Sequence, residues 1–274
     1  MWKSGKIMLL VPSIRAICEG PITNKNGSGV MVAGLSARIE TTNSPQMTRV
    51  PFVESYAIID HNSEDTKAKT NDLKELMDDP LAFADNFQGR RFFKSHLPFE
   101  FLPPKLLETC KVVYVSRNPR DAANSSYHWR LGNFKGSYET FMDMFLEGDH
   151  IWGNFFHHLL GGWSRIGNPN LKFIWYEEMK KDHMRTIRDL CTFLEHPLSE
   201  EQIARLAEYL RFDNMKKNPN CNPTAGLKWR SVEFMRKGEV GDWRNYFSEE
   251  MEKKWNDWIE ENVQGSGLEF IKNF

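Results

Sequence analysis

The stretch "KVVYVSRNPRDAANSSYHWR", residues 111–130, decides the fold because it joins a strand to a helix without a loop. It begins as an apolar run typical of a buried strand. Asn118 is a good N-cap and Pro119 fits the first helical position, so a helix is expected to start directly after the strand. The sequence therefore predicts that Arg117 lies beside the positive end of a helix.

An arginine at this place indicates an anion site, since the guanidinium and the helix terminus would both stabilise negative charge. Ser125, eight residues later, lies close to the same helical face, and its hydroxyl could bind the same anion. The alternative is a structural ion pair of Arg117 with Asp121 or Glu177. For the arginine alone, the two interpretations carry similar weight.

Two more apolar runs end on polar residues: "RRFF" leads into Lys94-Ser95-His96, and "LKFIW" leads into Tyr176-Glu177-Glu178. Amphipathic stretches lie between and after the runs, and one of them has a capping-box spacing at Ser199 and Gln202. The alternation predicts a single α/β domain with a central parallel sheet flanked by helices on both faces. Ligands of such a sheet bind beyond the carboxyl ends of its strands.

Composition narrows the classes of partner. The 274 residues carry 36 Lys plus Arg against 37 Asp plus Glu, so no overall field attracts nucleic acid or an anionic membrane. No run approaches the ~20 apolar residues of a membrane span. The cysteines lie far apart and form no metal-type or redox pair, which suits a reducing compartment; they are Cys18, Cys110, Cys191 and Cys221. We expect a cytoplasmic protein that binds no metal, nucleic acid or membrane.

Five segments together resemble the cytosolic sulfotransferases, enzymes that use 3′-phosphoadenosine 5′-phosphosulfate (PAPS) as co-substrate. In chain order they are "FFKSHLPFEFLP", "VYVSRNPRDAANSSYHW", "FIWYEEMKKD", "RFDNMKKNP" and "FMRKGEVGDW". The resemblance runs from about Val50 to the carboxyl end of the chain. It implies the P-loop-like sulfotransferase fold over residues 50–274.

The resemblance implies a general base and a charge-stabilising residue in "KSHLP". His96 would take the proton from the acceptor hydroxyl, which suits a side chain whose ordinary pKa is near neutrality. Lys94 would offset charge around the transferring sulfuryl group. Taken alone, His96 is as easily a core histidine at a strand end, and Lys94 an ordinary solvated lysine.

The nucleotide-binding residues implied by the resemblance come from four segments. Arg117, Ser125 and the turn Arg236-Lys237-Gly238 would hold the 3′-phosphate through a guanidinium fork, a hydroxyl and a glycine that permits close approach. Tyr176 and Phe212 would contact the adenine, and Met215 would complete the cofactor site. An aromatic residue at a strand end is more often simply core.

The acceptor implied is a small hydrophobic alcohol or phenol, sulfated by in-line transfer without a metal or a covalent enzyme intermediate. His158, in "WGNFFHHLLGGW", matches a position that lines the acceptor pocket, and Phe155 would line it as well. A buried helix face explains these aromatic residues equally well.

The chain departs from the family most at its start. Members carry a strand followed by a loop like "YPKSGTTW" that cradles the 5′-phosphosulfate. Here Lys3, in "MWKSGK", would be the lysine of a remnant loop, residues 7–20 would be a poor copy of the helix after it, and the first strand would be missing. We expect residues 1–49 to form a divergent, partly disordered segment.

Two further departures concern binding and assembly. Arg211 stands where a small hydroxyl residue is usual. "RNYFSEEMEK" does not match the family's dimerisation pattern, so a homodimer stays open without support from that motif. Two functions stay open: a PAPS-dependent sulfotransferase, or an impaired or truncated form that binds a nucleotide or a hydrophobic ligand without catalysis.

Overall fold

The computed structural model describes residues 6–10, 91–129, 134–218, 221–222 and 234–274. The described strands are β1 (Lys6–Leu10), β2 (Arg91–Ser95), β3 (Cys110–Ser116) and β4 (Leu171–Trp175). The described helices and 3-10 turns are η1 (Phe99–Phe101), α7 (Leu106–Thr109), α8 (Pro119–His128), α9 (Tyr138–Glu147), α10 (Phe155–Trp163), α11 (Tyr176–Lys181), α12 (His183–Phe193), α13 (Glu200–Tyr209), α14 (Phe212–Lys217), η3 (Asp242–Asn245), α15 (Glu249–Val263) and η4 (Glu269–Asn273).

The four described strands form one parallel sheet in the order β2-β1-β3-β4, as the sequence predicts for the fold class. In the register, Leu10 of β1 lies opposite both Ser95 of β2 and Tyr114 of β3. The three carboxyl ends that carry polar residues therefore meet at one edge of the sheet. His96, Arg117 and Tyr176 follow these ends directly.

The expectation that a first strand is missing is wrong. β1, which begins at Lys6, pairs with both neighbours and occupies the place between them. Periodicity cannot distinguish a helix from a strand in an apolar run as short as "IMLL". The two flanking strands decide, because an unfilled place would leave their hydrogen-bonding groups unpaired. Lys3 and the segment 20–49 lie outside the described residues.

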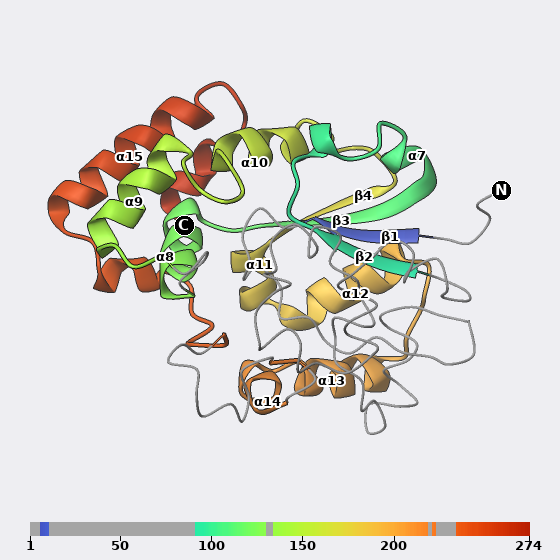
Figure 1. The fold of residues 1–274 in the computed structure, drawn as a ribbon. Coiled ribbons are helices and arrows are strands. Elements are labelled where there is room, and N and C mark those ends of the chain that lie inside the picture. The colour runs from blue at the N-terminus through green and yellow to red at the C-terminus, as the bar shows by residue number, and fades with distance from the viewer. Residues whose placement is uncertain (1–5, 11–90, 130–133, 219–220, 223–233) are drawn as a thin grey trace, which may run out of the picture.

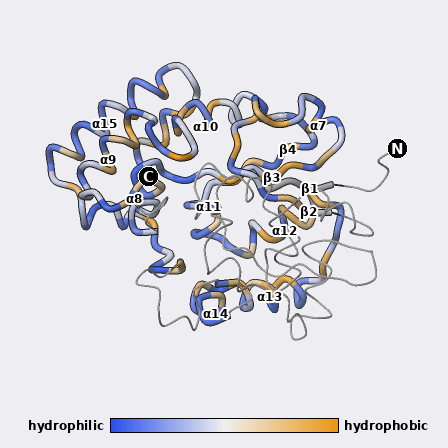
Figure 2. The backbone as a smooth tube through the Cα atoms, viewed as in Figure 1, coloured by the Kyte–Doolittle hydropathy of each residue, from blue (hydrophilic) through white to orange (hydrophobic). Residues whose placement is uncertain are grey.

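Helices cover the sheet on both faces (Figure 1). Each face of the sheet has its own hydrophobic core, and alternate residues of β3 belong to one or the other. Val112 and Tyr114 pack with α8, α9, α10 and α15. Val113 and Val115 pack with α12 and α13. Figure 2 shows hydrophobic and hydrophilic stretches alternating along α12 and α13, as expected for helices with one buried face. Among the described residues, no helix is both long and apolar enough to cross a membrane.

The predicted helix starts are confirmed. The Asn118 side chain accepts a hydrogen bond from the Arg120 N–H and Pro119 is the first residue of α8. Ser199 and Gln202 form both hydrogen bonds of a capping box at the start of α13. Because only Arg117 and Asn118 separate the end of β3 from the start of α8, the amino terminus of α8 lies at the carboxyl edge of the sheet.

Candidate active site

Arg117 is buried at the amino end of α8 and is held by three groups. Its Nη2 lies 3.4 Å from Asp121 Oδ2 and donates to the Glu239 carbonyl at 2.8 Å. The guanidinium carbon lies 4.5 Å from the centre of the Tyr176 ring. Of the two alternatives for Arg117, the ion pair with Asp121 is present, and an anion site must use the remaining N–H groups.

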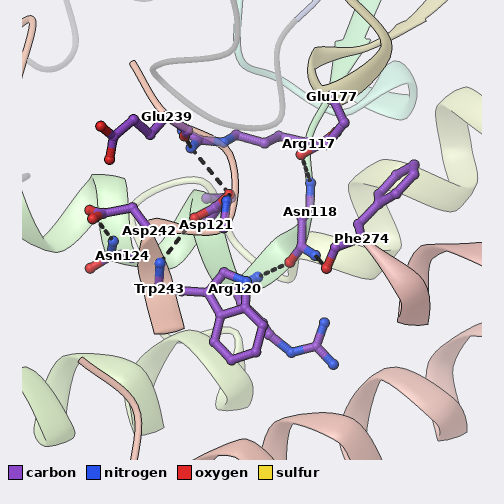
Figure 3. Close-up of polar contacts among 12 residues, drawn as sticks. Arg117, Asn118, Arg120, Asp121, Asn124, Glu177, Glu239, Asp242, Trp243 and Phe274 are labelled. Atoms are coloured by element: carbon purple, nitrogen blue, oxygen red, sulfur yellow. Dashed lines mark hydrogen bonds and ion pairs between the residues drawn. The ribbon is translucent and has the colours of Figure 1, made fainter. Parts of the chain in front are cut away.

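Asp121 joins helix α8 to the loop that carries Arg236 (Figure 3). Its carboxylate accepts the backbone N–H of Gly241 at 2.6 Å and that of Trp243 at 3.2 Å. Both bonds are charge-assisted and at least one is buried, so they are stronger than ordinary amide bonds. They place the turn Arg236-Lys237-Gly238 beside Arg117.

Asp242 organises the cations of the same turn. Its carboxylate accepts hydrogen bonds from Arg236 Nη2, from Lys237 Nζ at 2.6 Å and from Asn124 Nδ2 at 3.2 Å. Burial opposes ionisation of Asp242, but the bonds from Lys237 and Arg236 hold the pKa of its carboxyl well below its ordinary range. The carboxylate thus stays charged and fixes both cations on one side of the pocket.

These residues line one pocket at the carboxyl edge of the sheet. Its lining comprises Arg117, Asp121, Asn124, Ser125, Tyr176, Phe212, Phe234, Met235, Arg236, Lys237, Gly238, Glu239 and Asp242. Buried atoms without a hydrogen-bond partner among the described residues include Ser125 Oγ, Arg117 Nε and Arg236 Nε. Buried donors of this kind are costly unless a ligand satisfies them. They fit a phosphate group, which offers several strong acceptor oxygens.

Aromatic residues close the other side of this pocket. Tyr176 and Phe212 line both it and a neighbouring pocket, which Met215, Lys180 and Arg211 also line. Gly238 has a φ of 68°, and a Cβ added to it would overlap the Phe212 ring. The turn therefore requires glycine for both its backbone and its contact. Each residue predicted to bind the 3′-phosphate or the adenine side of the nucleotide lines one or both of these adjoining pockets, whereas Lys3 lies outside the described residues.

His96 follows β2 and is buried, with its ring stacked on Trp152 at 4.4 Å between centroids. Burial, with the charge of Lys94 and the neighbouring His158 and His150, holds the pKa of His96 well below its ordinary range. The ring is therefore neutral at physiological pH. Lys94 itself is half-buried in β2, near enough to His96 to affect its pKa.

His158 lies in α10 and contacts the backbone of His96. Its Nε2 is 3.0 Å from the His96 carbonyl oxygen, and its Nδ1 is 2.7 Å from the Tyr114 hydroxyl. Both ring nitrogens are thus occupied within the protein. Phe155, predicted with His158 to line an acceptor pocket, is buried and packs against Phe145 and Phe156 in the core.

Sequence reasoning gave no site role to Asp242 or Asn124. One signal was available for Asn124: Arg117, Asp121, Asn124 and Ser125 follow the spacing i, i+4, i+7, i+8, which puts them on one side of a helix. Glu177, considered only as an ion-pair partner, instead accepts the Asn118 backbone N–H at 2.8 Å and fixes the strand-to-helix turn. Burial raises the pKa of its carboxyl, although the Asn118 N–H opposes this.

Among the described residues, no group of three or more His, Cys, Asp or Glu side chains could hold a metal ion.

The fold and the pocket define an α/β protein with a pocket lined by Arg117, Arg236 and Lys237 at the carboxyl edge of a central parallel sheet. Comparison with known proteins makes this class specific. Residues 27–267 match the family model described as the sulfotransferase domain, and the chain belongs to this family.

Curated relatives include sulfotransferase 1B1 of Mus musculus, which is 35% identical over 189 residues, 66% of this chain and 63% of that protein. Luciferin sulfotransferase of Photinus pyralis is 29% identical over 233 residues, 80% of this chain and 63% of that protein. The matches thus span less than two thirds of these relatives' length. Among solved structures, retinol dehydratase in a complex with retinol and PAP is 27% identical, with a TM-score of 0.79 over 97% of this chain and 83% of that one.

Proposed function

We propose that the protein transfers a sulfuryl group from PAPS to the hydroxyl of a small hydrophobic alcohol or phenol. The observation that carries the proposal is the pocket in which Arg117, Ser125 and Arg236 converge from distant parts of the chain. Its unpartnered buried donors suit a phosphate that is not at the transferring end of the nucleotide. The retinol dehydratase structures, which contain PAP, support the same ligand class.

In this reaction the acceptor oxygen bonds to sulfur while the bond from sulfur to the 5′-phosphate oxygen breaks. The hydroxyl proton passes to His96, which is neutral because burial lowers its pKa. Lys94 offsets negative charge that develops around the transferring group. The 3′-phosphate held by Arg117, Ser125 and the Arg236-Lys237-Gly238 turn orients the donor, and Tyr176, Phe212 and Met215 contact its adenine.

The acceptor class rests on two observations. His96 is buried, with Trp152 stacked against its ring. The two structures of retinol dehydratase hold retinol or androsterone, which both carry oxygen on an apolar skeleton. A hydrophobic hydroxyl compound would bring its oxygen to His96 and leave the remainder in apolar surroundings.

A second candidate is a protein that binds the nucleotide without transferring the sulfuryl group. The family match begins at residue 27 and leaves out Lys3, which the resemblance implies as the 5′-phosphosulfate contact; in sequence Lys3 also precedes β1, whereas the pocket lies at the carboxyl ends of the strands. A loop donor of this kind is typically worth ~3 kcal/mol to a transition state. Without it, 3′-phosphate recognition would persist while transfer became slow.

Calorimetry and a transfer assay separate the two candidates. We expect 3′,5′-diphosphoadenosine to bind much more tightly than adenosine 5′-monophosphate, because only the former satisfies Arg117 and Ser125. Equal affinities would contradict both candidates. Radiolabelled sulfate transfer to phenols and hydrophobic alcohols would establish the enzyme, whereas tight binding without transfer would establish the second candidate.

The assignment of His96 has its own test within the transfer assay. His96→Ala is expected to lower turnover by ~10²–10⁴ and to leave the affinity for 3′,5′-diphosphoadenosine unchanged. His157→Gln, at an exposed histidine paired with Glu100, serves as the control. Full turnover in the His96 variant would remove this residue from the mechanism.

A further inference from the structure

We infer that Tyr114 and His158 are positioning residues that hold His96 in place through a buried chain of hydrogen bonds. The inference rests on the proposed function, since it assigns these residues to the reaction in which His96 takes a proton. It gives His158 a role behind the base rather than in contact with the acceptor.

The chain of hydrogen bonds begins at Tyr114, in the middle of the sheet. Tyr114 lies in the central strand β3 with a fully buried side chain. Its ring stacks near Phe173 at 4.8 Å, and its hydroxyl reaches α10, where it contacts His158 Nδ1 at 2.7 Å and the His158 carbonyl at 3.0 Å. Strand β3 therefore fixes the position of His158 from below the helix.

The hydrogen-bond pattern determines the tautomer of His158. The His96 carbonyl oxygen can only accept, so His158 Nε2 must carry the proton in the 3.0 Å contact. Burial lowers the pKa of His158 to about 4, so the ring is neutral and its Nδ1 is an acceptor. The single Tyr114 O–H is then shared between two acceptors, that Nδ1 and the His158 carbonyl, and the Nδ1 contact is the shorter one. Loss of the hydroxyl would permit the other tautomer, which directs a lone pair at the His96 carbonyl.

Three contacts hold His96 in place. Its carbonyl accepts from His158, its ring stacks on Trp152, and the next backbone N–H, of Leu97, donates to Ser95 Oγ at 3.0 Å. A general base must lie within hydrogen-bond reach of the proton it takes, and a displacement of about 1 Å can cost ~10²-fold in rate. The hydrogen bond from His158 therefore affects turnover more than nucleotide binding.

Three variants test the inference. Tyr114→Phe keeps the ring but removes the hydroxyl, and it should lower kcat by ~10- to 100-fold while leaving the KM for PAPS within about twofold. His158→Leu should have the same effect. His158→Gln should retain most of the turnover, because its amide N–H can reach the His96 carbonyl. If Tyr114→Phe turns over at the wild-type rate, or if glutamine fails to restore what leucine loses, the inference is wrong.

The double variant Tyr114→Phe/His158→Gln separates positioning from stability. Glutamine needs no tautomer set by Tyr114, so the two kcat effects should be far from additive. A purely structural role would give no such coupling. Ile187→Ala, in the core on the opposite face of the sheet, supplies a control that is destabilised without touching α10. Its kcat should match the wild type.

Nitrogen NMR of the histidine rings gives a readout that needs no activity. We expect His158 to show a neutral ring protonated at Nε2, and Tyr114→Phe to change the signals of both His158 and His96. If the wild-type chain transfers no sulfuryl group, the proposed function fails and the NMR result decides the inference. Unchanged His96 signals in Tyr114→Phe, or a His158 ring protonated at Nδ1, would overturn it. If Tyr114→Phe does not fold, the His158→Gln and His158→Leu pair decides.

Discussion

Asp121 accepts the backbone N–H of Gly241 at 2.6 Å, although the two residues are 120 positions apart. The contact ties the first turn of α8 to the loop that supplies Arg236 and Lys237. Since Asp121 also lies 3.4 Å from Arg117, one carboxylate contacts both sides of the pocket that Arg117 and Arg236 line. We therefore expect binding of a 3′-phosphate to depend on a residue that need not touch it.

Asp121→Ala should both destabilise the protein and weaken nucleotide binding. The substitution leaves two backbone N–H groups and the buried Arg117 charge without this partner, a loss of about 3–5 kcal/mol. Asp121→Asn retains an acceptor and should lose less. Urea denaturation and calorimetry with 3′,5′-diphosphoadenosine measure the two effects. Asp257→Asn, which removes an exposed pair with Lys253, should change neither; an unchanged affinity in Asp121→Ala would show that the loop holds its place without this contact.

Ser125→Ala isolates recognition of the 3′-phosphate. The Ser125 hydroxyl has no hydrogen-bond partner among the described residues, so its loss should leave stability unchanged or slightly higher. Affinity for 3′,5′-diphosphoadenosine should fall ~10-fold or more, because a bond to a charged group is lost, while affinity for adenosine 5′-monophosphate stays the same.

The neighbouring Ser126 provides the matched control. Its hydroxyl donates to the Ala122 carbonyl at 2.9 Å within the same helix. Ser126→Ala should therefore not affect either nucleotide. Equal effects of the two substitutions on 3′,5′-diphosphoadenosine would mean that Ser125 is not a phosphate ligand.

Much of the sheet and of the pocket could be predicted from short-range patterns. The strand-to-helix turn at Asn118-Pro119 and the capping box at Ser199 depend on residues close together in sequence, and both are confirmed. The residues expected to bind the 3′-phosphate and the adenine were predicted from the family resemblance, and in the structure they line two adjoining pockets. Local chemistry was sufficient where the partner was local.

Long-range contacts could not be predicted in this way. No sequence pattern predicts the contact of Tyr114 with His158, which lies 44 residues away. The same holds for Asp121 and Gly241, which join the two sides of the pocket and are 120 residues apart. For β1, an apolar run of a few residues is compatible with either a helix or a strand, and its neighbours in the sheet decide. In each case the deciding partner is distant in sequence.

Stability should fall as the pH is lowered from about 6.5 toward 4. Burial lowers the pKa of His158 to about 4 in the folded protein, so its ring is neutral above that pH. In the unfolded chain its pKa is about 6.5, so the ring takes up a proton as the pH falls below that value. The unfolded state therefore binds more protons in this window, and acid favours unfolding. One such histidine contributes about 1.4 kcal/mol per pH unit to the slope.

His158→Gln should flatten the dependence of the unfolding free energy on pH, measured by urea denaturation between about pH 4.5 and 7.5. The adjacent His157 is exposed and paired with Glu100, so His157→Gln, which leaves the buried His158 in place, is the control and should change the slope less than His158→Gln does. Groups such as Glu177, whose pKa shifts in the opposite sense, are common to all the proteins and cancel in the comparison. An unaltered slope in His158→Gln would mean that His158 is not held neutral by the fold.

Two neighbouring glycines of α10 give opposite predictions for the same substitution. A Cβ added at Gly162 would lie 2.5 Å from Tyr114 Cε2, whereas one at Gly161 would meet no atom within 4 Å. Alanine in a helix is favoured over glycine by up to ~1 kcal/mol, so Gly161→Ala should stabilise the protein. Gly162→Ala gains the same propensity but must displace a ring that is clamped between the helix and β3, and overpacking of this kind costs ~1–3 kcal/mol. It should therefore lower the free energy of unfolding relative to Gly161→Ala and, by moving the Tyr114 hydroxyl, lower kcat as Tyr114→Phe does. Equal stability and equal turnover of the two alanine variants would show that the Tyr114 ring does not lie against α10.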